Sequence, residues 1–287
     1  MAAIKKAVPK KRLVAMKRPI RGKKPALQYT SKERQEHGSD LEINCLETFV
    51  RYIEANTNLE YVLYRGQKED WPLVPKLSRV KIRSGNELAA ERMMLENFKR
   101  LARPHLSKIP GNDWEWLALA QHHGMATRLL DWTSNPLAAL WFAIAQPSTS
   151  KYGVVHVLFA DEKAFLKPTE IHKLDPFKET KPKIFQPEIS TIRIQSQSGW
   201  FTTQKLNKRT NNFEPFNKSS SFSRDMQRLI IPSECFSDLR YQLDKFGVNR
   251  FSLFQDLDGI AAYAEWSHTQ FTDEGEPDAN LTKGKKL

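Results

Sequence analysis

Residues 116–143, WLALAQHHGMATRLLDWTSNPLAALWFA, hold more polar side chains in an apolar frame than any other stretch of this chain. Two adjacent histidines, a glycine, an arginine, an aspartate, a threonine and a serine occur within residues 122–134. Buried polar groups need partners, so such a cluster is either a satisfied hydrogen-bond network or a functional site. As a site, it offers His123 and Asp131 for general acid and base catalysis, and Arg128 to bind phosphate.

Two strand-like runs outside this stretch carry further candidates. Residues 61–66, YVLYRG, are rich in β-forming residues and end in glycine, which predicts a strand with Arg65 at its end. Residues 192–203, IRIQSQSGWFTT, contain Gln197, and the glycine inside that run predicts a bulge or the close approach of a ligand. An alternative for Arg65 is a buried ion pair with Asp131 that only specifies the fold.

The histidines and Arg128 also have structural interpretations. His122 and His123 point in different directions on a helix, so both can face one site only if the helix ends between them. We expect His123, beside Gly124, to bond to backbone or ligand and His122 to be structural. Arg128 could equally tie a loop to the C-terminus of a helix. His156 is expected to be a hydrogen-bonded histidine within a sheet rather than a ligand.

Periodicity and capping residues predict the elements that position these side chains. The first predicted helix begins near Ser39 and Asp40, and further helices are predicted over residues 86–103, 114–122, 135–144, 233–246 and 253–266. Strands are predicted over residues 61–66, 129–132, 154–159 and 229–231. Residues 161–186 and 207–223 show no period and are expected to be surface loops. The pattern indicates an α+β fold, with a mixed or antiparallel sheet and helices on its faces.

The net charge of the chain is concentrated at its N-terminus. The chain has 45 Lys and Arg against 33 Asp and Glu. Ten of the basic residues lie in residues 1–24, which hold no acidic residue, so the rest of the chain has a net charge of only +2. Residues 1–38 are predicted to form a disordered basic arm. Such an arm can bind nucleic acid or an acidic partner, or can simply be a solubilising extension. Residues 39–268 would then form the catalytic domain and residues 269–287 a polar tail.

Several classes of protein gain no support from the sequence. Cys45 and Cys235 show neither a zinc-ligand nor a disulfide spacing, so no metal is predicted. No apolar run is long enough for a signal peptide or a membrane span, and a cytoplasmic protein is expected. The motifs GxGxxG, GxxxxGK[ST], HExxH and GxSxG are absent, which argues against dehydrogenase, P-loop, zincin and serine esterase chemistry.

Five segments together resemble the FRG domain family over residues 45–266. They are YRGQ at residues 64–67, LVPKLSR at 73–79, the whole stretch 116–143, RIQSQSGWFT at 193–202 and SLFQDLDGIAAY at 252–263. Families of this kind occur in bacteria and their phages, including toxin and phage-defence contexts. The resemblance therefore implies a bacterial cytoplasmic location, a role in growth arrest or phage defence, and a neutralising antitoxin as protein partner.

A weaker resemblance connects YRG with the arginine strand of arginine-serine-glutamate type ADP-ribosyltransferases, which implies an ADP-ribosyltransferase-like fold and NAD as a substrate. DWTSNPLAALWFA has the strand-to-helix form of the second motif in that family, and Gln197 is the candidate for its last member. The implied catalytic residues are Arg65, Asp131, Thr133, Gln197 and His123. The implied NAD-binding residues are Tyr64, Arg65, Gly66, His122, His123, Arg128 and Ser134.

The implied reaction has physical requirements of its own. Cleavage of the bond between nicotinamide and ribose develops positive charge on the sugar, so the enzyme must hold the diphosphate and support that charge. The Arg65 guanidinium can grip phosphates with a bidentate fork, and Thr133 or Ser134 can fix the ribose. Because glutamine cannot act as a base, another acid such as Glu188 or Asp131 would do so, or the reaction would depend on orientation alone.

Three function classes remain open from the sequence. The first is an ADP-ribosyltransferase toxin whose acceptor is nucleic acid, because the basic arm can concentrate a polyanion, with RNA favoured over DNA. The second is a nuclease or NAD glycohydrolase that uses His123 and Asp131. The third is a noncatalytic nucleic-acid-binding module in which the central stretch only folds the domain.

Overall fold

The computed structural model describes residues 40–56, 61–83, 85–178, 181–188, 197–204, 206–207, 212–218 and 225–275. The basic arm predicted for residues 1–38 lies outside the described residues, as do the end of the predicted polar tail and residues 192–196 of the run that contains Gln197.

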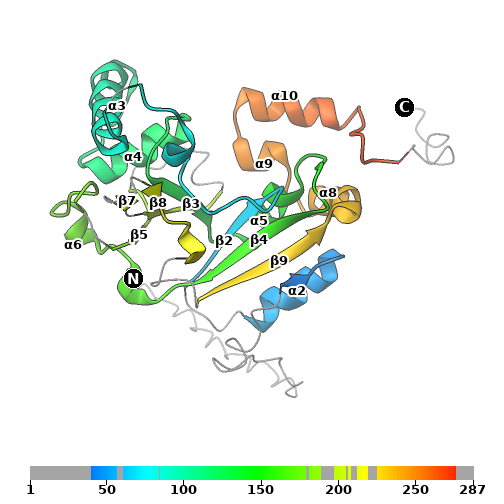
Figure 1. Cartoon of the computed structure of the whole chain (residues 1–287). Coiled ribbons are helices and arrows are strands. Elements are labelled where there is room, and N and C mark those ends of the chain that lie inside the picture. Colours follow the sequence, from blue (N-terminus) through cyan, green and yellow to red (C-terminus); the bar gives the residue numbers. More distant parts are fainter. Residues whose placement is uncertain are drawn as a thin grey trace, which may run out of the picture.

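A seven-stranded mixed sheet forms the centre of the molecule (Figure 1). Its strands, in sheet order, are β1 (Leu41–Glu42), β9 (Met226–Pro232), β4 (Tyr152–Phe159), β2 (Val62–Gln67), β3 (Leu129–Thr133), β6 (Gly199–Thr203) and β5 (Ile184–Phe185). Neighbouring strands are antiparallel except β1 and β9, which are parallel. A separate two-stranded ribbon pairs β7 (Leu206–Asn207) with β8 (Asn212–Phe213). The predicted α+β class is confirmed.

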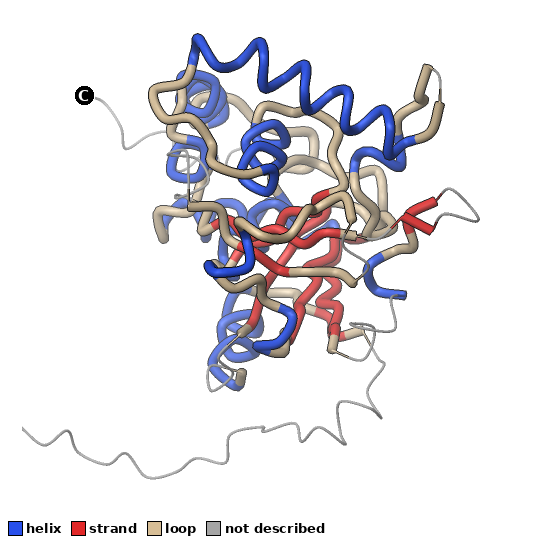
Figure 2. Tube along the Cα trace, turned by 90° about the vertical axis from the view of Figure 1, so that its left-hand side faces the viewer, coloured by secondary structure: helices blue, strands red, loops and turns tan. Residues whose placement is uncertain are grey.

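Helices cover the sheet, which appears in Figure 2 as one layer between them. They are α2 (Leu46–Ala55), α3 (Glu87–Ala102), α4 (Asp113–His122), α5 (Pro136–Ile144), α6 (Pro168–Ile171), α8 (Phe236–Lys245), α9 (Arg250–Phe254) and α10 (Leu257–Trp266). In the described part of the chain, no helix has the length and apolar character needed to cross a membrane.

Alternate residues of the strands supply separate parts of the core. Tyr64, Val155 and Val157 pack with the buried faces of α2, α5 and α8. Leu63 and Leu158, which alternate with these residues along the same strands, pack in a second cluster with Leu73, which follows β2, and with Phe216. The helices α3 and α4 form a further core with β3, β5 and β6. In Figure 1, α3 and α4 lie on one side of the sheet region and α9 and α10 on the other.

The predicted helix start near Ser39 and Asp40 is wrong. Leu41 and Glu42 instead form β1, whose residues pair with Leu229 and Ile230 of β9. The helix begins only at Leu46, after Cys45, whose side chain makes no capping hydrogen bond. The backbone groups of β1 are satisfied by a strand that is distant in sequence, and this tertiary pairing overrides the local helical pattern.

The single helix predicted for residues 253–266 is two helices. Gln255 has a left-handed backbone with φ of 44°, which ends α9. Asp256 then caps α10, because its carboxylate accepts a hydrogen bond of 2.7 Å from Gly259 N. This break separates α9 from α10, which packs against it.

The predicted surface loop at residues 161–186 also contains structure. Ile184 and Phe185 form the edge strand β5, where their side chains are 0% and 1% exposed. The predicted bulge at Gly199 is a strand start instead, because Ser198 has a left-handed φ of 49° and turns the chain into β6.

Candidate functional site

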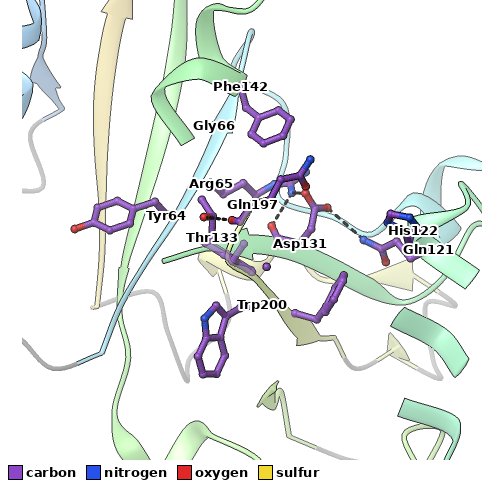
Figure 3. Close-up of a pocket in the computed structure, with 13 residues that line it drawn as sticks. Tyr64, Arg65, Gly66, Gln121, His122, Asp131, Thr133, Phe142, Gln197 and Trp200 are labelled. Carbon is purple, nitrogen blue, oxygen red and sulfur yellow. Dashed lines mark hydrogen bonds and ion pairs between the residues drawn. The ribbon is translucent and has the colours of Figure 1, made fainter. Parts of the chain in front are cut away.

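A cavity of about 320 Å³ lies where β2 and β3 separate (Figure 3). Small-molecule sites commonly have volumes of a few hundred Å³. Its lining comes from β2, the end of α4, β3, α5 and the start of β6, and consists of Tyr64, Arg65, Gly66, Gln121, His122, Asp131, Trp132, Thr133, Phe142, Gln197, Gly199, Trp200 and Phe201. Seven of the residues predicted for the site are among them.

The strand pairing explains why a cavity opens here. β2 pairs with β4 along its whole length, from Val62 to Gln67, but its register with β3 contains only the pair of Tyr64 with Thr133. The Arg65 side chain fills part of the gap beyond this pair. Its Nη1 donates to the backbone oxygen of Asp131 at 2.7 Å and lies 2.7 Å from the carboxylate Oδ2. A guanidinium thus makes the contact that a strand neighbour would otherwise make.

The carboxylate of Asp131 is ionised and reaches solvent. Partial desolvation by the surrounding protein acts to raise the pKa of Asp131, but the charge and hydrogen bond of Arg65, helped by the charge of Arg79, hold the pKa below its usual value. The side chain of Asp131 is 63% exposed, whereas that of Arg65 is 15% exposed. Gln121 Nε2 donates to the other carboxylate oxygen at 3.3 Å, and Thr127 Oγ1 in turn donates to Gln121 Oε1 at 2.6 Å. The cavity therefore holds a fixed anion beside a fixed cation.

Thr133 and Gln197 form a second small network at the cavity. Thr133 Oγ1 donates to the backbone oxygen of Gln197 and accepts from Asn135 N at 2.9 Å. Gln197 Nε2 donates to Leu253 O of α9 at 3.1 Å. Because a hydroxyl has one proton, Thr133 is already committed, and its contribution is to hold the turn that carries Gln197 at the cavity.

Gly66 allows helix α5 to approach β2 closely. A Cβ at this position would collide with Ala139 O and lie 2.8 Å from Ala143 N. The same packing brings Phe142 of α5 to the cavity. Tyr64 points the other way, away from Arg65 in Figure 3, and burial in the core raises the pKa of its phenol to about 12. Tyr64 therefore borders the cavity, but its phenol does not provide an ionisable group there.

The helix α4 ends between the two histidines. His122 is its last residue, His123 is the C-terminal cap, and Gly124 follows with a left-handed φ of 85°. The rings lie 4.8 Å apart at 84° to each other. His122 lines the cavity, whereas His123 is exposed and outside the lining. The structure thus reverses the expected positions of these two residues.

Arg128 lies outside the cavity and is 2% exposed. Its guanidinium donates to Glu91 Oε2 from Nε at 2.8 Å and from Nη2 at 2.6 Å, and to Pro176 O from Nη1 at 2.9 Å. Its backbone N donates to Glu91 Oε1 at 2.7 Å. With these partners, Arg128 ties β3 to α3, and the structure does not bring it together with Arg65.

Two other candidates also lie away from the cavity lining. Ser134 is exposed, and its backbone N donates to Ser198 O at 3.2 Å. Glu188, weighed as an alternative base, is exposed and donates its backbone N to Glu115 Oε1 at 2.9 Å. Asp131 is therefore the acidic residue that the structure places at the cavity.

The sequence interpretation missed the aromatic wall and one polar contact. Phe142, Trp200 and Phe201 line the cavity together with Gln121. The run GWFTT at the start of β6 held a usable signal, because two aromatic residues directly follow the turn that carries Gln197.

The described residues contain no group of three His, Cys, Asp or Glu side chains that could hold a metal ion. Both cysteines are free thiols. His156, in β4, is 1% exposed, and its Nε2 lies 3.0 Å from Gln67 Oε1. Its Nδ1 is buried without a hydrogen-bond partner, as is Arg65 Nε on the neighbouring strand. Arg65 Nε is thus a buried donor without a hydrogen-bond partner among the described residues.

Comparison with known proteins gives one match. Residues 60–152 match the family model of the FRG domain. This range contains β2, α3, α4, β3 and α5, and therefore Arg65, His122, Asp131 and Thr133 of the cavity, while Gln197 lies beyond it. No curated protein and no solved structure matches the chain.

Proposed function

We propose that this FRG-domain protein is an NAD-dependent ADP-ribosyltransferase that acts as a bacterial toxin on nucleic acid. The observation that carries the proposal is the convergence of Arg65, Asp131, Thr133 and Gln197 on one cavity. These residues come from three strands or strand ends that are far apart in the sequence. They are the residues that the resemblance to arginine-serine-glutamate type transferases selects.

Arg65 is suited to hold the diphosphate of NAD. Guanidinium presents five donors, and Asp131 engages Nη1 while Nε has no partner. The pair with Asp131 reaches solvent through the carboxylate, so a phosphate can replace the carboxylate at a small cost. In this proposal, Arg65 pairs with Asp131 when the site is empty and with the diphosphate when NAD is bound.

Asp131 is suited to act next to the sugar. As its bond to the ribose breaks, nicotinamide leaves with the bonding electrons, and positive charge develops on the ribose. An ionised carboxylate stabilises that charge, and it can accept the proton that the acceptor loses as the new bond to the sugar forms. The aromatic rings of Phe142 and Trp200 offer flat surfaces for nicotinamide. Thr133 positions Gln197 rather than contacting the substrate.

The charge around the cavity favours a polyanionic acceptor. Arg79 is exposed and close enough to lower the pKa of Asp131, and Lys76 lies nearby, where it donates to Gly124 O at 2.7 Å. Residues 1–24 add ten positive charges. RNA is the favoured acceptor, DNA the alternative, and binding should weaken as salt rises. A cytoplasmic role in growth arrest or phage defence and an antitoxin partner are parts of the same proposal.

The test uses purified full-length protein with labelled NAD and, separately, total RNA, single-stranded DNA and lysate protein. The variants are Arg65→Lys, which keeps the charge but loses the fork, and Asp131→Asn, which keeps the shape. Each should lower transfer by roughly 100-fold or more. Arg51→Lys is the matched control, because the Arg51 pair with Glu47 is exposed on α2, away from the cavity. Circular dichroism establishes that all variants are folded.

Three results would contradict the proposal. Absence of both label transfer and nicotinamide release from folded wild type would refute the NAD mechanism. Nicotinamide release with all label in free ADP-ribose would assign a glycohydrolase. Full transfer by both variants would show that the reaction occurs elsewhere on the chain. Cleavage of RNA without NAD would then favour the nuclease, and RNA binding alone the noncatalytic module.

A further inference from the structure

A second cavity, of about 470 Å³, also borders α5 but shares no lining residue with the candidate site. It is lined by α5, α8, α9, α10 and the segment that follows α10, which lie close together in Figure 1. We propose that this cavity binds a planar aromatic compound that carries an anionic group. The proposal concerns binding at this cavity and does not depend on NAD being a substrate.

The walls of the cavity supply flat apolar surfaces. Trp141 comes from α5, Tyr263 and Trp266 from α10, and Phe271 from the segment after it. The rings of Tyr263 and Trp266 lie 6.2 Å apart at 41°. Aromatic walls of this kind favour a ring that can stack or pack edge to face. The volume falls within the range of small-molecule sites.

One of the two arginines at the cavity is fully engaged. Arg240 is 3% exposed at its side chain and pairs with Asp273 and Glu274. It also donates to Ile144 O at 2.9 Å and lies over the Phe271 ring at 5.1 Å. These contacts consume the charge of Arg240, so it builds the wall of the cavity.

Arg250 is the cation left for a ligand. Its guanidinium lies over the Phe254 ring at 4.7 Å, and its Nε is buried without a hydrogen-bond partner. Across the described ranges, no carboxylate forms an ion pair with Arg250. Asp244 is used by others, since it accepts from Asn249 at 2.8 Å and bonds with Tyr263. A carboxylate, sulfonate or phosphate on the ligand would complete the donors of Arg250.

The second cavity shares an aromatic wall with the first. Trp141 lines the second cavity and Phe142 the first, and both rings pack on Phe254 with centroid distances of 5.8 Å and 6.0 Å. Phe254 and Arg250 belong to α9, whose Leu253 O accepts the hydrogen bond from Gln197. A ligand on Arg250 would therefore sit on the helix that holds Gln197.

The test compares two fluorescent probes with the same ring framework. One is 1-anilinonaphthalene-8-sulfonate, which carries a sulfonate, and the other is the uncharged N-phenyl-1-naphthylamine. Full-length protein should bind the sulfonate probe more tightly than the neutral probe, with a saturable component that persists in Arg65→Met. Arg250→Met should weaken the sulfonate probe about tenfold, as the loss of one charged hydrogen bond does, and change the neutral probe less than twofold. Ala262→Trp, which fills the cavity, should weaken both.

Matched controls locate the site. Arg65→Met and Arg51→Met should leave the affinity for both probes unchanged. Near-ultraviolet circular dichroism with and without probe must show intact tertiary structure, because partly unfolded proteins also bind the sulfonate probe. The proposal is overturned by equal affinity of wild type for both probes, by an equal effect of Arg250→Met on both, or by loss of sulfonate binding in Arg65→Met alone.

Discussion

The buried pair of Arg128 with Glu91 gives the sharpest quantitative prediction, because the structure assigns it to stability. The side chains are 3% and 0% exposed, and the carboxylate accepts three hydrogen bonds from Arg128. Glu91→Gln or Arg128→Met leaves one charge buried and unpaired. Each single change should therefore lower the free energy of unfolding by about 3–5 kcal/mol.

Urea unfolding followed by circular dichroism measures this loss. With a slope of about 3 kcal/mol per molar urea, the midpoint should fall by roughly 1–1.7 M. The double variant Glu91→Met/Arg128→Met removes both charges. Its loss of unfolding free energy should be smaller than the summed losses of the two single variants, because the double variant leaves no unpaired charge in the core. Glu47→Gln is the control. It breaks an exposed pair, with side chains 71% and 75% exposed, and should cost no more than about 0.5 kcal/mol.

The reasoning fails if Arg128→Met leaves the unfolding midpoint unchanged. That result would mean that Arg128 is free to leave Glu91, as a phosphate-binding arginine would be. Additive losses in the double variant would also contradict it, because they would show that the two charges stabilise the fold independently.

Two further predictions concern the strands around the cavity. Gly66→Ala should lower the free energy of unfolding by about 1–3 kcal/mol or more, because the new methyl group meets backbone atoms of α5, whereas Gly111→Ala meets nothing within 4 Å and should leave the melting temperature unchanged. Burial and the charges of Arg65 and Arg228 lower the pKa of His156 to about 3, so the unfolded chain binds a proton near pH 6.5 that the folded chain does not. Stability from this residue is complete above pH 6.5 and should fall by about 2 kcal/mol by pH 5, a loss that His156→Gln should remove from urea unfolding curves. An unchanged pH slope in that variant would contradict a buried neutral histidine.

The elements that could be predicted from the sequence carry their signals locally. Helix α3 begins after Asn86 and α5 after Asn135, and each asparagine accepts hydrogen bonds from the first turn of its helix. The strands β1 and β5 have no such signal. Each is two residues long and exists because of a partner elsewhere, as Leu41 pairs with Leu229. Short stretches of this kind are defined by tertiary contacts that no local window contains.

The candidate site was predictable to a similar extent. The YRG motif led to Arg65, and the strand-to-helix form of residues 131–143 led to Asp131 and Thr133, all of which line the cavity. Which of His122 and His123 faces the cavity depends on how the end of α4 is oriented relative to the sheet. Sequence periodicity does not give that orientation. Arg128 lies in the same polar stretch as Asp131, but its partner Glu91 stands 37 residues earlier in the chain.

The two arginine–carboxylate pairs near β3 show how structure resolves what sequence leaves open. Both Arg65 with Asp131 and Arg128 with Glu91 are satisfied pairs, so pairing alone does not separate a functional arginine from a structural one. Exposure does: the carboxylate of Asp131 is 63% exposed and that of Glu91 is 0% exposed. A solvated carboxylate can release its arginine at little cost, since water replaces the lost contact. A buried carboxylate cannot, because an unpaired charge would remain in the core. A ligand anion can therefore compete more easily for Arg65 than for Arg128, and this difference supports the proposal that the cavity between β2 and β3 binds an anion.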